Sequence, residues 1–294
     1  MIRPDLCDRL RQVFEVGHHP LTPQPAQARP IPGSNFQQLK FSTKTGQEVR
    51  AFFALPDAPS PAPAILYIHA HGNRYDIGAR EVLDGRHALQ GALGQTLVDM
   101  GFAVLCVDLP GFGGRADRSE SDLTKAALWQ GGSLAGQMIA ELQAAFEWLS
   151  EQDRVDQTRV GVFGISMGAT LGYWLGAAEP RVAAVAQLCC FADFAKLIEY
   201  GAHDLHGVYL TVPGLLNIAS NGEIAGQIAP RPQFVGIGDQ DPLTQAGAVD
   251  PALAELRRAY ADCPEHLTVF RSEETGHQET PEMRRALLEY LRAL

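Results

Sequence analysis

Short apolar runs alternate with longer amphipathic segments from about residue 64 to the C-terminus. The runs, in chain order, are AILYIH, FAVLCVD, RVGVFG, VAAVAQLCC, QFVGIG and LTVF. Continuously apolar runs of this length are typical of parallel strands buried on both faces, and the segments between them have helical spacing. The pattern predicts an α/β fold with a mostly parallel, doubly wound sheet.

Two earlier segments predict an antiparallel N-terminal hairpin at an edge of that sheet. They read FQQLKFST and EVRAFFAL, and the turn signal Thr45-Gly46-Gln47 separates them. Residues 1–35 contain an amphipathic helix and then a proline-rich stretch, which we expect to run extended over the surface as a connector. We therefore expect one domain over residues 36–294.

Apolar residues at helical spacing predict three of the covering helices. The first stripe ends at Gly101 and consists of Leu89, Leu93, Leu97 and Met100. The second consists of Leu134, Met138, Leu142, Phe146 and Leu149. The last helix is expected to begin with Thr280 as its N-cap and Pro281 at its first position, and its apolar face consists of Met283, Leu287, Leu291 and Leu294.

The interval between VAAVAQLCC and QFVGIG is longer than a simple crossover requires. It extends from about residue 191 to 231 and contains YGAHDLHGVYLTVPGLL, which mixes aromatic, histidine and apolar residues. Ligands of doubly wound folds bind at the carboxyl edge of the sheet. We expect this excursion to cover that edge as a small cap after the sixth predicted strand. The alternative is an extra pair of helices without substrate contact.

Composition and charge narrow the classes of partner and compartment. The chain has 34 acidic and 24 basic residues, a net charge of -10, and no basic cluster that would follow a phosphate backbone, so we expect no nucleic-acid partner. No stretch approaches the roughly 20 apolar residues of a membrane span, and the N-terminus lacks the apolar core of a signal peptide. We expect a cytoplasmic protein with no membrane partner.

The five cysteines are expected to be reduced thiols. Their number is odd, and three of them lie in apolar runs that predict buried strands. Adjacent Cys189 and Cys190 are expected to point to opposite faces of a strand, which disfavours a shared metal.

The stretch GVFGISMGA places Ser166 between Gly164 and Gly168 where an apolar run gives way to a helical pattern. A strand, a sharp turn and a helix are the context that a nucleophile elbow requires, and flanking glycines let the backbone close the strained turn. Ser166 is then presented at a helix N-terminus, where backbone N–H groups stabilise negative charge.

GISMG, followed by an acid and then a histidine, resembles the α/β-hydrolase superfamily from about residue 36 onward. YIHAHGN, DLPGFGGR, VDQTRVGVFGISMGA and IAPRPQFVGIGDQDPLT are similar to the branch of dienelactone-hydrolase-like and acetyl-xylan-esterase-like proteins. Dienelactone hydrolases proper carry a cysteine where Ser166 stands, so the resemblance does not extend to their particular lactone chemistry.

A serine nucleophile needs a base, and the base needs a carboxylate that fixes its tautomer. In the superfamily's chain order the base comes last, which leaves His266 and His277. His266 opens a predicted strand, whereas His277 follows it, so we expect His277. For the acid, the superfamily's spacing after Gly238 implies Asp241, and Asp239 stays as the alternative.

The resemblance also implies an oxyanion hole made by two backbone N–H groups. One belongs to Met167, and the other comes from the loop in AILYIHAHGNR. If His69-Ala70 takes the place of the superfamily's His-Gly pair, the second donor is His71. A shifted register makes Asn73 the donor.

The same loop has a metal-ligand spacing, His-x-His, with further candidates downstream at His203, Asp204 and His206. The aspartate and histidine expected directly after a metallohydrolase H-x-H are missing, because Gly72 and Asn73 stand there. The glycine-rich PGFGG lacks the lysine and spacing of a nucleotide loop. We expect no metal and no cofactor.

These residues predict a serine carboxyl-ester hydrolase that acts on small or short-acyl esters through an acyl-enzyme. Four residues of the excursion are expected to narrow the acyl pocket, namely Tyr200, His206, Tyr209 and Leu215. The alternatives are an amidase or peptidase, or a thioester or lactone hydrolase, on the same triad, and a non-catalytic binding protein on a hydrolase fold. The predicted partner is a small-molecule ester, and a homo-oligomer is left open.

Overall fold

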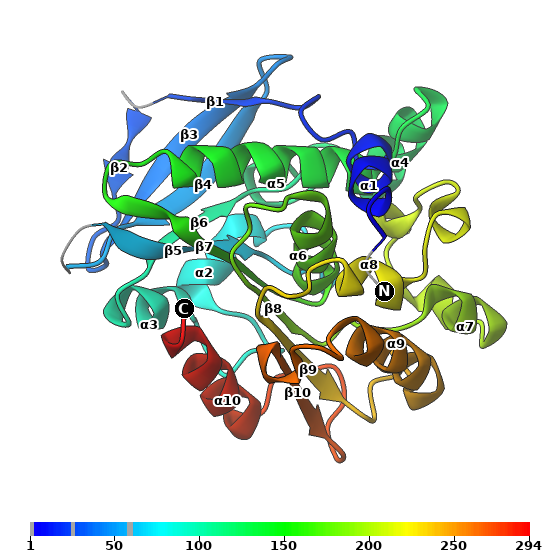
Figure 1. Cartoon of the computed structure of the whole chain (residues 1–294). Helices are drawn as coiled ribbons and strands as arrows, with labels where there is room; N and C mark the ends of the chain where they lie inside the picture. Colours follow the sequence, from blue (N-terminus) through cyan, green and yellow to red (C-terminus); the bar gives the residue numbers. More distant parts are fainter. Residues whose placement is uncertain (1–2, 25–26, 58–60) are drawn as a thin grey trace.

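The computed structural model describes residues 3–24, 27–57 and 61–294, whose strands form one ten-stranded sheet with helices on both faces (Figure 1). The strand order is β1-β3-β4-β6-β5-β7-β8-β9-β10, and β2 pairs with β3. The strands are β1 (Leu21–Pro23), β2 (Arg29–Pro30), β3 (Phe36–Thr43), β4 (Glu48–Ala54), β5 (Ala62–Ile68), β6 (Ala103–Val107), β7 (Val155–Ile165), β8 (Val185–Leu188), β9 (Gln233–Gly238) and β10 (Leu267–Ser272).

The sheet from β6 to β10 is parallel throughout, which confirms the predicted doubly wound α/β fold. β5 pairs in parallel with β6 and β7, and the order continues in parallel through β8, β9 and β10. Every residue of β6, β8 and β9 is buried, as expected for strands with helices on both faces. The carboxyl ends of β5, β7, β9 and β10 therefore meet at one edge of the sheet.

The N-terminal region continues this sheet instead of standing apart from it. β3 and β4 form the predicted antiparallel hairpin, and β1 and β2 pair with β3 beyond it. The proline-rich stretch thus contributes two short edge strands, positions where a missing backbone N–H is tolerated. Phe14, just after the first helix, stacks on Trp174 with ring centroids 5.1 Å apart. The domain boundary at residue 35 stays a prediction.

The helices cover the two faces of the sheet around two buried apolar clusters. One face carries α1 (Leu6–Val13), α5 (Leu134–Ser150), α6 (Met167–Ala178), α8 (Asn221–Gly226) and α9 (Ala246–Ala259). The other carries α2 (Glu81–Asp84), α3 (Gly94–Asp99) and α10 (Pro281–Arg292). No helix among the described residues is long and apolar enough to cross a membrane.

Two of the three predicted helices are confirmed, and the third is wrong over half its length. α5 covers the second stripe, and α10 begins at Pro281 with the Thr280 hydroxyl accepting from the Met283 N–H. The first stripe is helical only from Gly94, and Leu89 lies in a turn. Gly91, with φ +102°, separates the two parts, a conformation that no α-helix contains.

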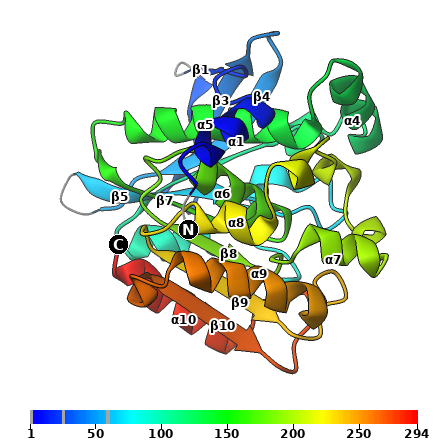
Figure 2. The same cartoon turned by 45° about the vertical axis from the view of Figure 1, so that its right-hand side comes forward.

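The excursion after β8 consists of short elements that lie beside α4 (Glu120–Trp129), as Figure 2 shows. It contains α7 (Phe194–Glu199), the 3-10 turns η4 (Ala202–Leu205), η5 (Val208–Leu210) and η6 (Leu215–Asn217), and α8. Six large apolar side chains of the described residues are exposed, and five of them belong to this excursion, which leaves it with an apolar outer surface.

The two adjacent cysteines correct one sequence expectation. β8 ends at Leu188, so Cys189 and Cys190 follow the strand and do not belong to it. Cys189 has φ +54°, which turns the chain sharply at the carboxyl edge. All five cysteines are free thiols, and three of them are buried.

Candidate active site

Ser166 lies at the tip of the turn between β7 and α6, with the strained backbone angles φ 58° and ψ -119°. The turn closes because its neighbours lack side chains. A Cβ on Gly164 would collide with the backbone of Gly168, and a Cβ on Gly168 would collide with the carbonyl oxygen of Ile68. The structure thus contains the predicted strand, sharp turn and helix, and Ser166 stands at the N-terminus of α6.

His277 and Asp241 complete a hydrogen-bonded chain with Ser166. His277 Nε2 lies 2.9 Å from Ser166 Oγ, and His277 Nδ1 lies 2.6 Å from Asp241 Oδ2. Asp241 follows β9 and His277 follows β10, so both loops leave the carboxyl edge that also presents Ser166. The Asp241 carboxylate accepts from Nδ1–H, which leaves the Nε2 lone pair directed at the serine hydroxyl.

The surroundings of Asp241 hold its carboxylate in place. Its side chain is fully buried, and it accepts hydrogen bonds from the Leu243 N–H (2.9 Å) and the Thr244 hydroxyl (3.1 Å). Three donors thus compensate the cost of burying this charge. The carboxylate can neither rotate nor leave His277 without losing them.

The alternative acid and base lie elsewhere. Asp239 forms an ion pair with Arg271 at 2.6 Å and does not contact His277. His266 lies in the turn before β10, where its Nδ1–H donates to the Pro230 carbonyl at 2.6 Å. The structure therefore brings together Ser166, Asp241 and His277.

A buried carboxylate that sequence reasoning missed anchors the loop of His277. Glu279 accepts from the Gln90 N–H at 2.8 Å and pairs with Arg284, while its own N–H donates to the Ala88 carbonyl at 2.8 Å. Gln90 precedes Glu279 by 189 residues. No local signal connects two positions so far apart in the chain.

The loop after β5 contains His69 and His71, and both rings have hydrogen-bond partners. His69 is buried, its Nε2 accepts from the Leu109 N–H, and its Nδ1–H donates to the Ala70 carbonyl. Burial lowers the pKa of His69 to about 3, so the ring is neutral. Among the described residues no group of three or more potential ligands could hold a metal ion.

The hydrogen bonds of the His71 ring distinguish between His71 and Asn73 as the second donor of the predicted oxyanion hole. The Asn73 N–H donates to His71 Nδ1 at 3.1 Å, so this N–H is already bonded within the loop. His71 Nε2–H in turn donates to Glu120 Oε2 at 2.8 Å. Asn73 therefore does not offer a free donor. His71 lies in the loop after β5, and the Ile68 and His69 carbonyls before it adjoin Gly168 of the Ser166 turn.

Glu120 connects this loop to the excursion. It accepts from His71, from the Tyr75 hydroxyl (2.7 Å) and from the Tyr209 N–H (2.6 Å). Burial opposes its ionisation, but these hydrogen bonds outweigh burial and lower the pKa of Glu120. Sequence reasoning did not identify Glu120, because it lies 49 residues from His71.

Residues 206–209 of the excursion form a bridge across the site. At one end the His206 Nε2–H donates to the Leu243 carbonyl at 2.9 Å, beside Asp241. At the other end the Tyr209 ring stacks on His71 at 5.6 Å between centroids. A Cβ on Gly207 would lie 2.8 Å from both Glu120 Oε1 and His71 Nε2, so the bridge contacts these groups directly.

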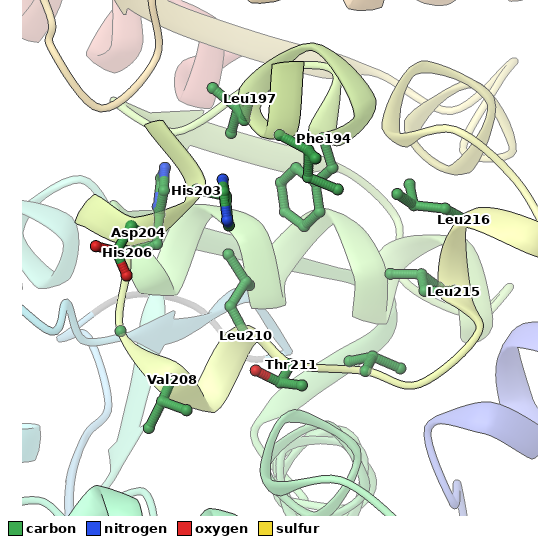
Figure 3. A pocket seen from close by; sticks show the side chains of 13 residues that line it. Phe194, Leu197, His203, Asp204, His206, Val208, Leu210, Thr211, Leu215 and Leu216 are labelled. Carbon is green, nitrogen blue, oxygen red and sulfur yellow. The ribbon is translucent and has the colours of Figure 1, made fainter. Parts of the chain in front are cut away.

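The excursion also forms an apolar cavity of about 370 Å³ that opens to solvent (Figure 3). Phe194, Leu197, Leu210, Leu215 and Leu216 form most of the apolar lining, and His203, Asp204, His206 and Thr211 add polar groups. A volume of this size falls within the roughly 300–1,000 Å³ of small-molecule sites. Every residue that lines it lies between 194 and 216.

The four residues predicted to share one pocket occupy three places. His206 and Leu215 line the cavity, and Tyr209 is buried against His71. Tyr200 is 46% exposed, lies against Gly247 at the start of α9 and does not line this cavity, so its place in the acyl pocket stays a prediction. Tyr200 ends α7.

Fold and site geometry define a member of the α/β-hydrolase superfamily, and comparison with known proteins agrees. Residues 45–245 match the family described as X-Pro dipeptidyl-peptidase (S15 family). The chain therefore belongs to this family of hydrolases.

The similar proteins include a putative hydrolase and acetyl xylan esterases. The chain is 34% identical over 252 residues to "Putative hydrolase YtaP" of Bacillus subtilis (strain 168), covering 83% of each protein. A "putative acetyl xylan esterase" of Bacteroides fragilis NCTC 9343 superposes with a TM-score of 0.71 at 16% identity, over 98% of this chain and 80% of that one. Acetyl xylan esterase of Paenibacillus sp. R4 superposes with a TM-score of 0.67 at 15% identity, over 100% and 95% of the two chains.

Proposed function

We propose that the protein is a serine carboxyl-ester hydrolase that works through an acyl-enzyme. The observation that carries this proposal is the hydrogen-bonded chain from Ser166 through His277 to Asp241. A serine hydroxyl is a weak nucleophile until a base within hydrogen-bond reach removes its proton, and an ester carbonyl is the electrophile that such an oxygen attacks.

In the acylation step, Ser166 Oγ bonds to the carbonyl carbon while its proton moves to His277 Nε2. Asp241 stabilises the imidazolium that forms. His277 then gives the proton to the leaving alcohol oxygen, and the bond between carbon and that oxygen breaks. Water repeats the sequence on the acyl-enzyme and releases the acid and the free serine.

The tetrahedral oxygen needs two N–H donors, and we assign them to Met167 and His71. Met167 is the first residue of α6, so its N–H lies at the positive end of the helix dipole. The His71 N–H is favoured over that of Asn73 because the latter donates to the His71 ring. Such donors contribute on the order of 10² to 10³ in kcat each.

Ester hydrolysis is favoured over dipeptide release. An enzyme that removes dipeptides must recognise a free amino terminus, and an ammonium group at a dry site requires an available carboxylate. Glu120 accepts from three donors of the protein and Asp241 likewise has three, whereas Asp204 on the cavity wall is exposed to solvent and does not form a dry site. The family description keeps an X-Pro peptidase as the second candidate.

The bridge of residues 206–209 and the cavity provide separate places for the acyl group and the alcohol moiety of an ester. Tyr209 is buried against His71 on the side of the proposed oxyanion loop, where it limits the acyl group to a short chain. The alcohol departs on the side of His277, which donates its proton. His206 lines the cavity and donates to the Leu243 carbonyl in the loop of Asp241, so we assign the cavity to an apolar alcohol moiety.

The test compares wild type with Ser166→Ala on p-nitrophenyl acetate, an acetyl thioester, a small lactone and an X-Pro p-nitroanilide. We expect the ester to be hydrolysed fastest, and the variant to lose on the order of 10⁶ in kcat with an unchanged circular dichroism spectrum. A fluorophosphonate should add its mass to the peptide that contains Ser166. Faster anilide turnover would favour the peptidase, and no turnover with no labelling would favour a binding protein.

A further inference from the structure

A buried ion pair adjoins the proposed oxyanion loop. It consists of Glu81, which is fully buried at the start of α2, and Arg86, whose side chain is 6% exposed. The Tyr67 hydroxyl donates to Glu81 Oε1 at 3.0 Å. None of these groups contacts the triad, so the mechanism above does not use them.

The pair holds the backbone of Ala70 from both sides. Glu81 Oε2 accepts from the Ala70 N–H at 3.0 Å, and Arg86 Nη2 donates to the Ala70 carbonyl at 3.0 Å. The guanidinium also lies against the next turn, because a Cβ on Gly72 would collide with Arg86 Nη1. Gly72, at φ +52°, thus leaves the space that the arginine fills.

The peptide unit that Arg86 holds is the one that carries the His71 N–H. In a planar trans peptide the carbonyl and the N–H point in opposite directions. Arg86 holds the Ala70 oxygen together with the His69 Nδ1–H, and fixing that oxygen fixes the His71 N–H on the opposite side of the peptide. The positive charge of Arg86 beside the Ala70 oxygen also polarises the amide, and this strengthens the His71 N–H as a donor.

We propose that Arg86, held in place by Glu81, is a positioning residue for the oxyanion donor of His71. The inference rests on the proposed serine-hydrolase function. It predicts that the pair acts on the transition state, where the oxyanion exists, and has little effect on substrate binding.

The chain offers a matched control in a second buried arginine and glutamate. Arg115 and Glu141 are each 1% exposed and lie 2.5 Å apart. Arg115 donates to the Asp108 carbonyl and to Gln47 and does not touch residues 69–73 itself; its link to them is indirect, through the Leu109 N–H that donates to His69. The same substitution at both arginines therefore distinguishes the loss of stability that follows from disturbing any buried ion pair from a specific effect on the loop of residues 69–73.

The experiment compares Arg86→Lys with Arg115→Lys in the full chain on p-nitrophenyl acetate. A lysine keeps the charge but lacks the fork that serves Glu81 and the Ala70 carbonyl together. We expect kcat of Arg86→Lys to fall roughly 10²-fold with KM nearly unchanged, since a small misplacement of a catalytic group has that effect. Arg115→Lys should keep kcat within about twofold at a comparable loss of melting temperature.

The inhibition constant of an alkylboronic acid distinguishes the proposed role of Arg86 from a purely structural one, which would leave this constant unchanged. The boronate forms a tetrahedral adduct with the serine, and one of its oxygens occupies the oxyanion position. Its Ki should rise in Arg86→Lys by about the factor that kcat falls. Should Arg86→Lys not fold, Glu81→Gln serves in its place, because it removes the charge that holds Arg86 and keeps the side-chain shape.

Two results would overturn the inference. One is a loss of kcat in the Arg86 variant no larger than in the Arg115 variant, and the other is a boronate Ki that stays constant while kcat falls. Either result leaves the proposed function intact as long as wild type hydrolyses the ester and is labelled at Ser166. Absence of both in wild type contradicts the proposed function itself.

Discussion

Asparagine at position 241 tests the proposed triad most sharply, because the neighbours of Asp241 dictate how the amide must orient. In the wild type, Oδ1 accepts from the Leu243 N–H and Oδ2 accepts from His277 Nδ1–H. The Leu243 N–H belongs to the backbone and cannot become an acceptor. The amide oxygen of the variant must therefore face Leu243, and its NH₂ must face His277.

This orientation forces the wrong tautomer on His277. An NH₂ donor opposite Nδ1 requires that Nδ1 accept, so the ring proton moves to Nε2, 2.9 Å from Ser166 Oγ. A protonated Nε2 cannot remove the serine proton. We expect kcat to fall about 10⁴-fold, equivalent to about 5.5 kcal/mol at 1.36 kcal/mol per tenfold change.

The assay is the steady-state hydrolysis of p-nitrophenyl acetate, with active sites titrated by a fluorophosphonate. Asp239→Asn is the matched control, because Asp239 lies two positions away, is 22% exposed in its side chain and pairs with Arg271 instead of His277. Its kcat should change by less than about threefold, since surface ion pairs contribute little. Retention of more than a tenth of wild-type activity in Asp241→Asn, or a larger loss in Asp239→Asn, would refute this reasoning.

Two further predictions concern stability and specificity. Because burial lowers the pKa of His69 to about 3 in the folded protein, the unfolded chain binds a proton first as pH falls below about 6.5, and stability decreases toward pH 3 by up to about 1.4 kcal/mol per pH unit. Between pH 6.5 and 4.5 the free energy of unfolding, measured in urea, should therefore fall by roughly 2–3 kcal/mol less in His69→Gln than in wild type. Equal decreases in the two proteins would contradict a neutral, buried His69. For specificity, acetate and propionate esters should exceed octanoate at least about tenfold in kcat/KM, Tyr209→Ala should weaken that preference, and hexyl acetate should exceed ethyl acetate. A chain-length profile that Tyr209→Ala leaves unchanged would exclude this ring as the limit on the acyl group.

The sequence alone was sufficient for features that depend on short-range pattern. Apolar runs and helical stripes follow from the repeat of strands and helices, and they predicted the parallel sheet, α5 and α10. The elbow at Ser166 is equally local, because the steric demand of the turn falls on glycines two positions away. The order of nucleophile, acid and base then reduced nine histidines to two candidates.

Tertiary structure decided the contacts between residues distant in the chain. His277 lies 111 residues from Ser166, Glu120 lies 49 residues from His71, and Glu279 lies 189 residues from Gln90. Hydrogen bonds of this kind depend on distances of about 3 Å between side chains that leave different strand ends. A linear pattern carries the residue types but not those distances, and for this reason Glu81, Arg86 and Glu120 emerge only in the folded chain.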